Sequence, residues 1–178
     1  MAGVPFQQVA TTTDERLTAH ETPEDFCLRV ARQKVGAAAQ GRQGDYWVLG
    51  ADTIVVVDDE ILGKPADEDD AAVMLRRLSG RDHLVLTAVV LLHVGTAIEQ
   101  SLTVRTNVTF RRLTEEWIGG YIRTGEPLDK AGAYGIQGRG AMLVSRINGS
   151  YTNVVGLPLS ETIALLEQAG IFRPFAAA

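Results

Sequence analysis

Asp52 is a carboxylate set among apolar residues. Leu49-Gly50-Ala51 precedes it, and the run Thr53-Ile54-Val55-Val56-Val57 follows it. A carboxylate buried alone in such surroundings costs free energy unless it meets a metal ion, a cation or hydrogen-bond donors. Asp52 is therefore a candidate general base or metal ligand. An aspartate that caps a turn is the alternative, and the local sequence leaves both interpretations open.

Two lysines can bring positive charge to such a carboxylate or to a phosphate. Lys34 is predicted on the apolar face of a helix beside Val30, where its stem can pack while its ammonium group reaches solvent. A phosphate contact at the rim of a cleft is the alternative for Lys34. Lys64 lies between Gly63 and Pro65, which stiffen the loop that presents it. Taken alone, Lys64 is more simply a solvated loop lysine.

The glycine-rich segment over residues 129–138 is the strongest local signal. It begins with Asp129 and Lys130 and carries a single amide, Gln137, near its end. Glycines let a backbone approach a ligand closely, and an amide can both donate to and accept from a base edge or a phosphate. The spacing is neither that of a Walker loop nor that of a dinucleotide fingerprint. Cysteine and histidine form no zinc pattern, so any metal should be a hard ion with oxygen ligands.

The first half of the chain must position these groups. Thr22 followed by Pro23 is typical of a helix start, and that helix should run to about Ala39. Residues 46–49 and 53–57 are predicted strands around an irregular elbow at residues 50–52. Residues 58–59 should form a turn into a short strand at residues 60–62. A second helix is predicted over residues 67–78.

The second half predicts two long strands, over residues 83–94 and 98–110. The alternation in the second of them is typical of a half-buried antiparallel strand. A helix over residues 114–123, a strand near residues 141–147 and a last helix over residues 158–169 complete the pattern. These elements predict an α/β fold with a mixed sheet and helices packed on it. A doubly wound parallel sheet fits less well, because short turns join too many strands.

Composition excludes several classes of protein. The 178 residues suit one domain, and no apolar run approaches the roughly 20 residues that a membrane span needs. A net charge of −5 argues against nucleic acid as the main partner, although a few lysines in a cleft can still bind a phosphorylated ligand. The lone Cys27 cannot form an internal disulfide, and the N-terminus lacks the features of a secretory signal. We therefore expect a cytoplasmic protein.

Taken together, several segments resemble the Maf family of nucleoside triphosphate pyrophosphatases over nearly the whole chain. The matching stretches are Ala51-Asp52-Thr53, Ile61-Leu62-Gly63-Lys64-Pro65, Leu75-Arg76-Arg77-Leu78-Ser79-Gly80, the block from Gly125 to Gly138, and Ser150-Tyr151 leading to Asn153-Val154-Val155-Gly156-Leu157-Pro158. The resemblance implies one domain over residues 1–178, with two lobes around a cleft across an elongated mixed sheet, usually as a homodimer. It also implies hydrolysis between the α- and β-phosphates of a nucleoside triphosphate.

The resemblance assigns expected roles to particular residues. Asp52 would be the proton acceptor that activates water, and Glu15 would join Asp52 in holding a divalent cation, Mg²⁺ or Mn²⁺. Positive charge near the phosphates would stabilise the pyrophosphate leaving group. The expected substrate-binding residues are Lys34, Thr53, Lys64, Asp129, Lys130 and Gln137. Within this set, Lys34 and Lys64 would contact the phosphates, while Thr53 and Gln137 would influence substrate choice.

The segments at residues 51–53 and 129–134 resemble the branch that acts on dTTP and UTP. A pyrophosphatase for 7-methyl-GTP or inosine triphosphate is one alternative. A non-catalytic nucleotide-binding regulator of septum formation is the other. Family members open with a strand and a Ser-x-Ser-Pro-Arg-Arg loop, whereas residues 2–6 resemble the sequence that follows that region. We expect the N-terminus to be truncated, with weaker triphosphate binding and an exposed sheet edge.

Overall fold

Five strands form one sheet in the computed structural model. The structure describes residues 3–18, 20–173 and 175. Met1 and Ala2, at the N-terminus that we expect to be truncated, lie outside these ranges. In chain order the strands are β1 (Trp47–Val57), β2 (Glu60–Leu62), β3 (Asp82–His93), β4 (Ile98–Phe110) and β5 (Val144–Asn148). Their order in the sheet is β2-β1-β3-β4-β5, and each of these described strands is antiparallel to its neighbours. The prediction of a mixed sheet is therefore wrong. Tight turns after β1 and β3 reverse the chain, so each following strand runs back beside its predecessor.

Strand β1 is continuous, so the predicted elbow at residues 50–52 is also wrong. Gly50, Ala51 and Asp52 pair in unbroken register with residues 88–90 of β3. The structure gives Gly50 a packing role instead. A Cβ at this position would lie 2.6 Å from Val35 Cγ2, so glycine is required for the first helix to pack closely on the strand.

Four of the helices in the described chain begin within one residue of the start that the sequence predicts. The bounds of the helices are α1 (Pro23–Ala39), α2 (Glu68–Leu78), α3 (Glu115–Ile122), α4 (Tyr151–Val155) and α5 (Leu159–Gln168). The side chains of Thr22, Asp67 and Thr114 cap α1, α2 and α3 by accepting a hydrogen bond from the amide three residues on. The short helix α4 was not predicted. The predicted strand near residues 141–147 begins only at Val144, because a 3-10 turn occupies Arg139–Leu143.

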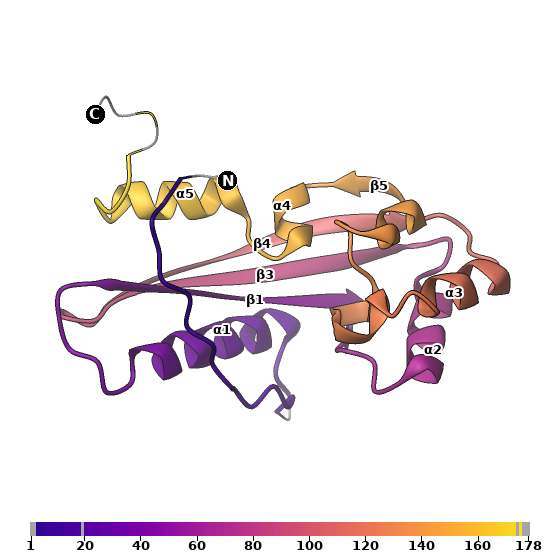
Figure 1. Cartoon of the computed structure of the whole chain (residues 1–178), viewed down its shortest axis with the longest axis horizontal. Helices are drawn as coiled ribbons and strands as arrows, with labels where there is room; N and C mark the ends of the chain where they lie inside the picture. The colour runs from indigo at the N-terminus through magenta and orange to yellow at the C-terminus, as the bar shows by residue number, and fades with distance from the viewer. Residues whose placement is uncertain (1–2, 19, 174, 176–178) are drawn as a thin grey trace.

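Helices α1 and α5 lie on opposite sides of the long strands (Figure 1), and alternate residues of a strand face opposite sides of the sheet. On one face, Leu86, Ala88 and Val90 of β3 pack against α1. On the opposite face, Val89 and Leu91 pack against α5 at one end of the sheet. At the other end of the molecule, α2 and α3 join the sheet in a separate core cluster. No helix in the described part of the chain combines the length and apolar character needed to cross a membrane.

His83 lies in an aromatic cluster at the α2–α3 end of the sheet. Its side chain is 4 % exposed, and its ring packs edge-on against Phe110 and Tyr134. Nε2 of His83 lies 2.8 Å from the Tyr134 hydroxyl, while Nδ1 has no hydrogen-bond partner among the described residues. Burial lowers the pKa of His83 from 6.5 to about 4, because a protonated ring there would lose hydration.

This shift predicts that the protein loses stability in mild acid. Between pH 6.5 and about 4 the unfolded chain binds a proton at His83 that the folded chain does not, so the free energy of unfolding falls as pH falls. The full effect is roughly 3 kcal/mol. Urea unfolding at pH 7 and pH 4 measures it. His83→Gln, which can still meet the Tyr134 hydroxyl, should lose correspondingly less. An equal loss in both proteins would assign the effect to other groups.

Candidate active site

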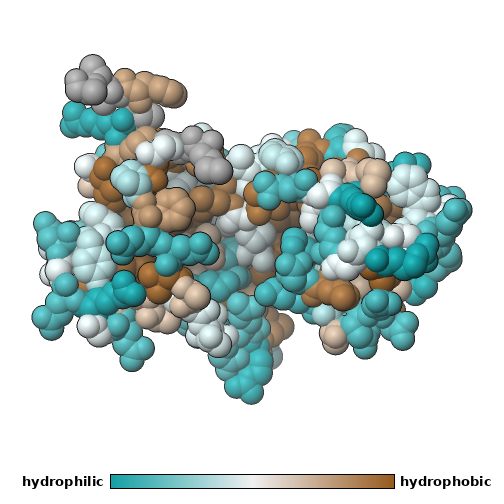
Figure 2. All heavy atoms as spheres, viewed as in Figure 1, coloured by the Kyte–Doolittle hydropathy of each residue, from teal (hydrophilic) through white to brown (hydrophobic). Residues whose placement is uncertain are grey.

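A cleft of about 750 Å³ contains every site residue that the sequence predicts. In the space-filling view the surface is indented between the end of the molecule that carries α1 and α5 and the end that carries α2 and α3 (Figure 2). The predicted residues in the lining are Glu15, Lys34, Asp52, Thr53, Lys64, Asp129, Lys130 and Gln137. Five separate stretches of the chain contribute them. The fold therefore brings the set together, whatever role each residue has.

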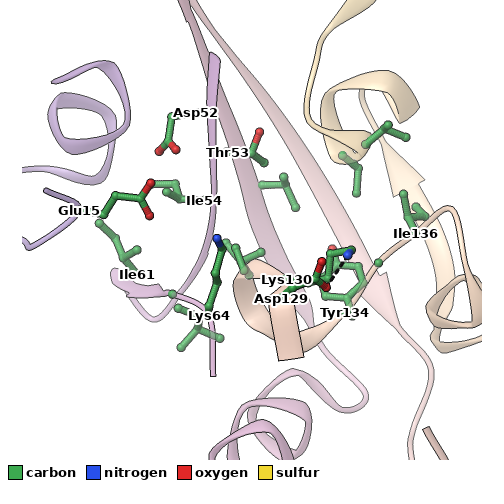
Figure 3. A pocket seen from close by; sticks show the side chains of 18 of the residues that line it. Glu15, Asp52, Thr53, Ile54, Ile61, Lys64, Asp129, Lys130, Tyr134 and Ile136 are labelled. Carbon is green, nitrogen blue, oxygen red and sulfur yellow. Dashed lines mark hydrogen bonds and ion pairs between the residues drawn. The ribbon is translucent and has the colours of Figure 1, made fainter. Parts of the chain in front are cut away.

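The free edge of β1 makes this gathering possible. Strand β2 pairs only with residues 55–57 of β1, so within the described chain residues 47–54 carry no strand on that side. Successive side chains of a strand point to opposite faces. In a strand with neighbours on both sides, Asp52 and Thr53 would therefore lie in separate layers. Here the cleft wraps around the edge, and Figure 3 shows Asp52 with Glu15 on one side of β1 and Thr53 on the other.

Lys34 bridges two carboxylates on the α1 side of the cleft. Its Nζ lies 2.5 Å from Oδ1 of Asp52 and 3.2 Å from Oε1 of Glu15. The Asp52 side chain is 9 % exposed, the Lys34 side chain 26 % and the Glu15 side chain 48 %. The simple interpretation of Lys34 as a packed stem with a solvated ammonium is therefore wrong, because the ammonium points at the buried acid instead.

The two charges affect each other's proton affinity. Burial raises the pKa of Asp52, and the nearby Glu15 carboxylate adds to this, while the Lys34 ammonium opposes it. Burial would lower the pKa of Lys34, but its contacts with Asp52 and Glu15 outweigh burial and raise it. Lys34 thus stays protonated, and Asp52 is a carboxylate whose proton affinity exceeds that of an exposed aspartate. This is the property that a general base requires.

Helix α1 holds Lys34 at this place through the residues around it. Val35 packs on Gly50, which sets the distance between helix and strand. About two helical turns before Lys34, the Cys27 thiol donates a hydrogen bond to the backbone carbonyl of Asp52 at 3.1 Å. Cys27 is fully buried, and burial raises its pKa to about 12, so the thiol is a packing group rather than a nucleophile.

Arg29 anchors the segment that carries Glu15. Its guanidinium donates to both carboxylate oxygens of Glu21, at 2.6 and 2.9 Å. It also donates to the carbonyl of Arg16 at 3.0 Å. Residues 3–18 cross from the α5 side of the sheet toward α1 (Figure 1), and these bonds fasten the end of that crossing to α1. Arg29 holds the residue next to Glu15, Arg16, while the Glu15 side chain itself contacts Lys34.

Thr53, on the other side of β1, belongs to a buried polar network that the sequence did not reveal. Its hydroxyl lies 2.9 Å from that of Thr87 in β3 and 3.4 Å from the carbonyl of Gly156. Thr87 donates to the carbonyl of Asn153, whose amide in turn donates to the carbonyl of Val85. Asn153 is fully buried. The network fixes the Thr53 hydroxyl and ties α4 to the sheet.

Lys64, Lys130 and Asp129 line the part of the cleft opposite α1 (Figure 3). Lys130 Nζ lies 2.5 Å from Oδ1 of Asp129; the Asp129 side chain is 75 % exposed and the Lys130 side chain 41 %. Gln137 is exposed within the glycine-rich segment. The cleft thus presents a proton acceptor on one side and lysine and amide groups on the other.

A metal ion at this site would rest on few protein ligands. Across the described ranges, no group of three or more histidine, cysteine or acidic side chains is arranged to hold one. Asp52 and Glu15 converge on a single point, since Lys34 Nζ reaches both. Two carboxylates, completed by phosphate oxygens and water, are a usual environment for Mg²⁺. The donor set therefore fits a hard divalent cation.

Comparison with known proteins gives a consistent result. The family model described as "Maf-like protein" matches residues 1–169. Proteins named dTTP/UTP pyrophosphatase from Escherichia coli O157:H7 and Escherichia coli strain K12 are each 48 % identical to the chain over 171 residues. A protein named nucleoside triphosphate pyrophosphatase from Shigella flexneri is 48 % identical over the same length. Each alignment covers 96 % of this chain and 86 % of the relative.

The ion pair predicts an asymmetric effect of mutation. Lys34→Met leaves the Asp52 carboxylate buried without its cation and should cost roughly 1–3 kcal/mol, less than for a fully buried pair because Lys34 is partly exposed. Adding Asp52→Asn removes the charge and should restore part of the loss. Lys130→Met, at an exposed ion pair, is the control and should change stability by about 0.5 kcal/mol or less. Urea unfolding of these three variants and of Asp52→Asn alone measures the coupling, and additive losses from the two single changes would contradict it.

Proposed function

This chain belongs to the Maf family, and on that premise we propose that its cleft hydrolyses dTTP and UTP to the nucleoside monophosphate and pyrophosphate. The observation that carries the proposal is the buried Asp52 carboxylate, 2.5 Å from the Lys34 ammonium, in a cleft large enough for a nucleotide. The 48 % identity to proteins named dTTP/UTP pyrophosphatase supports the choice of substrate.

Asp52 would act as the general base. Its carboxylate accepts a proton from the water whose oxygen attacks the α-phosphorus. The bond from that phosphorus to the oxygen bridging the α- and β-phosphates then breaks, and pyrophosphate leaves with the bonding electron pair. A general base contributes about 10²- to 10⁴-fold to such a step. Lys34 lies beside Asp52 and favours its ionised form.

Charge balance in the cleft supports a requirement for a divalent cation. Among its described lining residues, the lysines are Lys34, Lys64 and Lys130, and the acids are Glu15, Asp52, Glu126 and Asp129. The lining therefore carries more negative than positive charge, and a triphosphate would add several further negative charges. A bound Mg²⁺ or Mn²⁺ would supply the missing positive charge and help to activate water. Glu15 and Asp52 are the residues proposed to hold it.

Thr53 and Gln137 are proposed to read the base. Both line the cleft away from the Lys34 side. The Gln137 amide can donate and accept hydrogen bonds, while the Thr53 hydroxyl, whose proton goes to Thr87 or Gly156, can accept one. The Thr53 hydroxyl is fixed by its contacts to Thr87 and Gly156, so it offers a defined direction to a base edge. Lys34 and Lys64 are proposed to contact the phosphates, and Asp129 and Lys130 to take part in substrate binding from the part of the cleft opposite α1. This division gives each side of β1 a separate task.

The proposal is tested by pyrophosphate release from a panel of nucleoside triphosphates with Mg²⁺ or Mn²⁺. We expect dTTP and UTP to be preferred over 7-methyl-GTP and inosine triphosphate. Asp52→Asn should lower kcat by about 10²- to 10⁴-fold with a smaller change in KM. Asp45→Asn makes the same chemical change at a 96 % exposed side chain outside the cleft and should leave kcat unaltered. A panel without any pyrophosphate release would support a nucleotide-binding regulator instead.

Removal of metal should abolish turnover. Excess EDTA is expected to stop pyrophosphate release, and added Mg²⁺ or Mn²⁺ should restore it. Glu15→Gln removes one proposed ligand and should raise the metal concentration for half-maximal activity by about tenfold or more. Glu167→Gln, an exposed carboxylate on α5, is the matched control. Equal metal dependence of the two variants would exclude Glu15 as a ligand.

A further inference from the structure

The glycine-rich segment is fastened to the fold by one carboxylate, Glu126. Its Oε2 accepts a hydrogen bond from the amide of Arg139 at 2.8 Å, and its Oε1 accepts from the amide of Gly140 at 2.9 Å. The Tyr121 hydroxyl donates to the same Oε1 at 2.8 Å and accepts from the amide of Gly135 at 3.1 Å. Both ends of residues 135–140 are therefore held, directly or through Tyr121, by a single side chain.

The close approach of Glu126 explains one of the glycines, and that of Tyr121 and the Gly135 backbone explains another. A Cβ on Gly138 would lie 2.4 Å from Oε2 of Glu126. A Cβ on Gly140 would lie 2.6 Å from both the Gly135 carbonyl oxygen and the Tyr121 hydroxyl. The sequence suggested that these glycines admit a ligand. The structure shows that they admit the anchoring side chains of the protein itself.

Gln137 lies within the span that Glu126 holds. Gln137 is exposed, and both Gln137 and Glu126 line the cleft. Gln137 has no side-chain hydrogen bond to the described protein, so its position depends on the backbone of residues 135–140. The carboxylate is also kept ionised. Burial would raise the pKa of Glu126, but hydrogen bonds from Gly140, Arg139 and Tyr121 outweigh burial and lower it.

We propose that Glu126 is a positioning residue for substrate selection: it fixes the backbone that presents Gln137 to the base of the nucleotide. The inference rests on the proposed pyrophosphatase function and adds a residue that determines its selectivity. Glu126 is not assigned a contact with the reacting phosphate. Its effect should appear in the choice among bases rather than in the rate of the chemical step.

The test replaces Glu126 by glutamine, which has nearly the same shape. One carboxylate oxygen becomes an NH₂ group, which turns a donor toward a donor and loses at least one of the bonds to Arg139, Gly140 or Tyr121. We expect the ratio of kcat/KM for dTTP to that for dGTP to fall by about tenfold, mainly through KM, while kcat for dTTP changes by less than about threefold.

The same variant should release the loop. Amide hydrogen exchange at residues 139 and 140 should be faster in Glu126→Gln, and trypsin should cleave more rapidly after Arg139, which is exposed. Glu126→Asp keeps the charge and should recover part of the selectivity. Glu116→Gln, an exposed carboxylate on α3, should match the wild type in every measurement. Leu165→Ala, on the buried face of α5, should lower stability without altering selectivity.

Each result bears on a different claim. Unchanged selectivity in Glu126→Gln, or a selectivity loss of equal size in Leu165→Ala, would overturn the positioning role. Binding of dTTP and dGTP is measured alongside turnover, so selectivity can be scored from the two Kd values even in a protein that does not hydrolyse them. Absent hydrolysis in the wild type would contradict the proposed function alone, and a Kd ratio that falls in Glu126→Gln would still support the role of Glu126.

Discussion

Lys34 and Asp52 meet at the free edge of β1, and the rest of the site depends on that contact. A buried carboxylate is costly without a partner, and the ammonium at 2.5 Å offsets this cost while leaving Asp52 able to accept a proton. The contact exists only because α1 packs closely enough on the strand. Gly50 allows the strand to approach Val35 of α1. About two turns before Lys34, the Cys27 thiol hydrogen-bonds to the same strand.

The edge of β1 also explains how one strand can serve two tasks. Asp52 and Thr53 point to opposite faces, yet both reach the cleft because, in the described chain, residues 47–54 have no strand on the side of β1 away from β3. Under the proposed function, the thickness of one strand separates the proton chemistry at Asp52 from recognition of the base at Thr53. Each side has its own support: α1 and Arg29 on one, and the Thr87–Asn153 network with Glu126 on the other.

Most of the contacts that support the cleft residues are ordinary hydrogen bonds, and they hold backbone that would otherwise be free to move. Glu126 accepts from two amides and a hydroxyl, and Asn153 joins α4 to β3. Such bonds contribute modest stability individually, but they limit the positions available to Thr53 and Gln137. Selectivity among similar nucleotides depends on such limits, because a displaced donor loses its bond to the correct base as well as its discrimination against the wrong one.

The sequence by itself determined the local structure and the chemical inventory. Thr22 caps its helix as predicted, and Asp52, Lys34, Lys64 and Gln137 were identified as candidates from residue type and context. Only the tertiary structure decided that β1 runs straight through Gly50, that the sheet is antiparallel, that Lys34 faces Asp52, and that Glu126 holds the glycine-rich loop. Capping acts between residues three apart and is legible locally. Burial, edge position and contacts between distant residues arise only when the layers pack together.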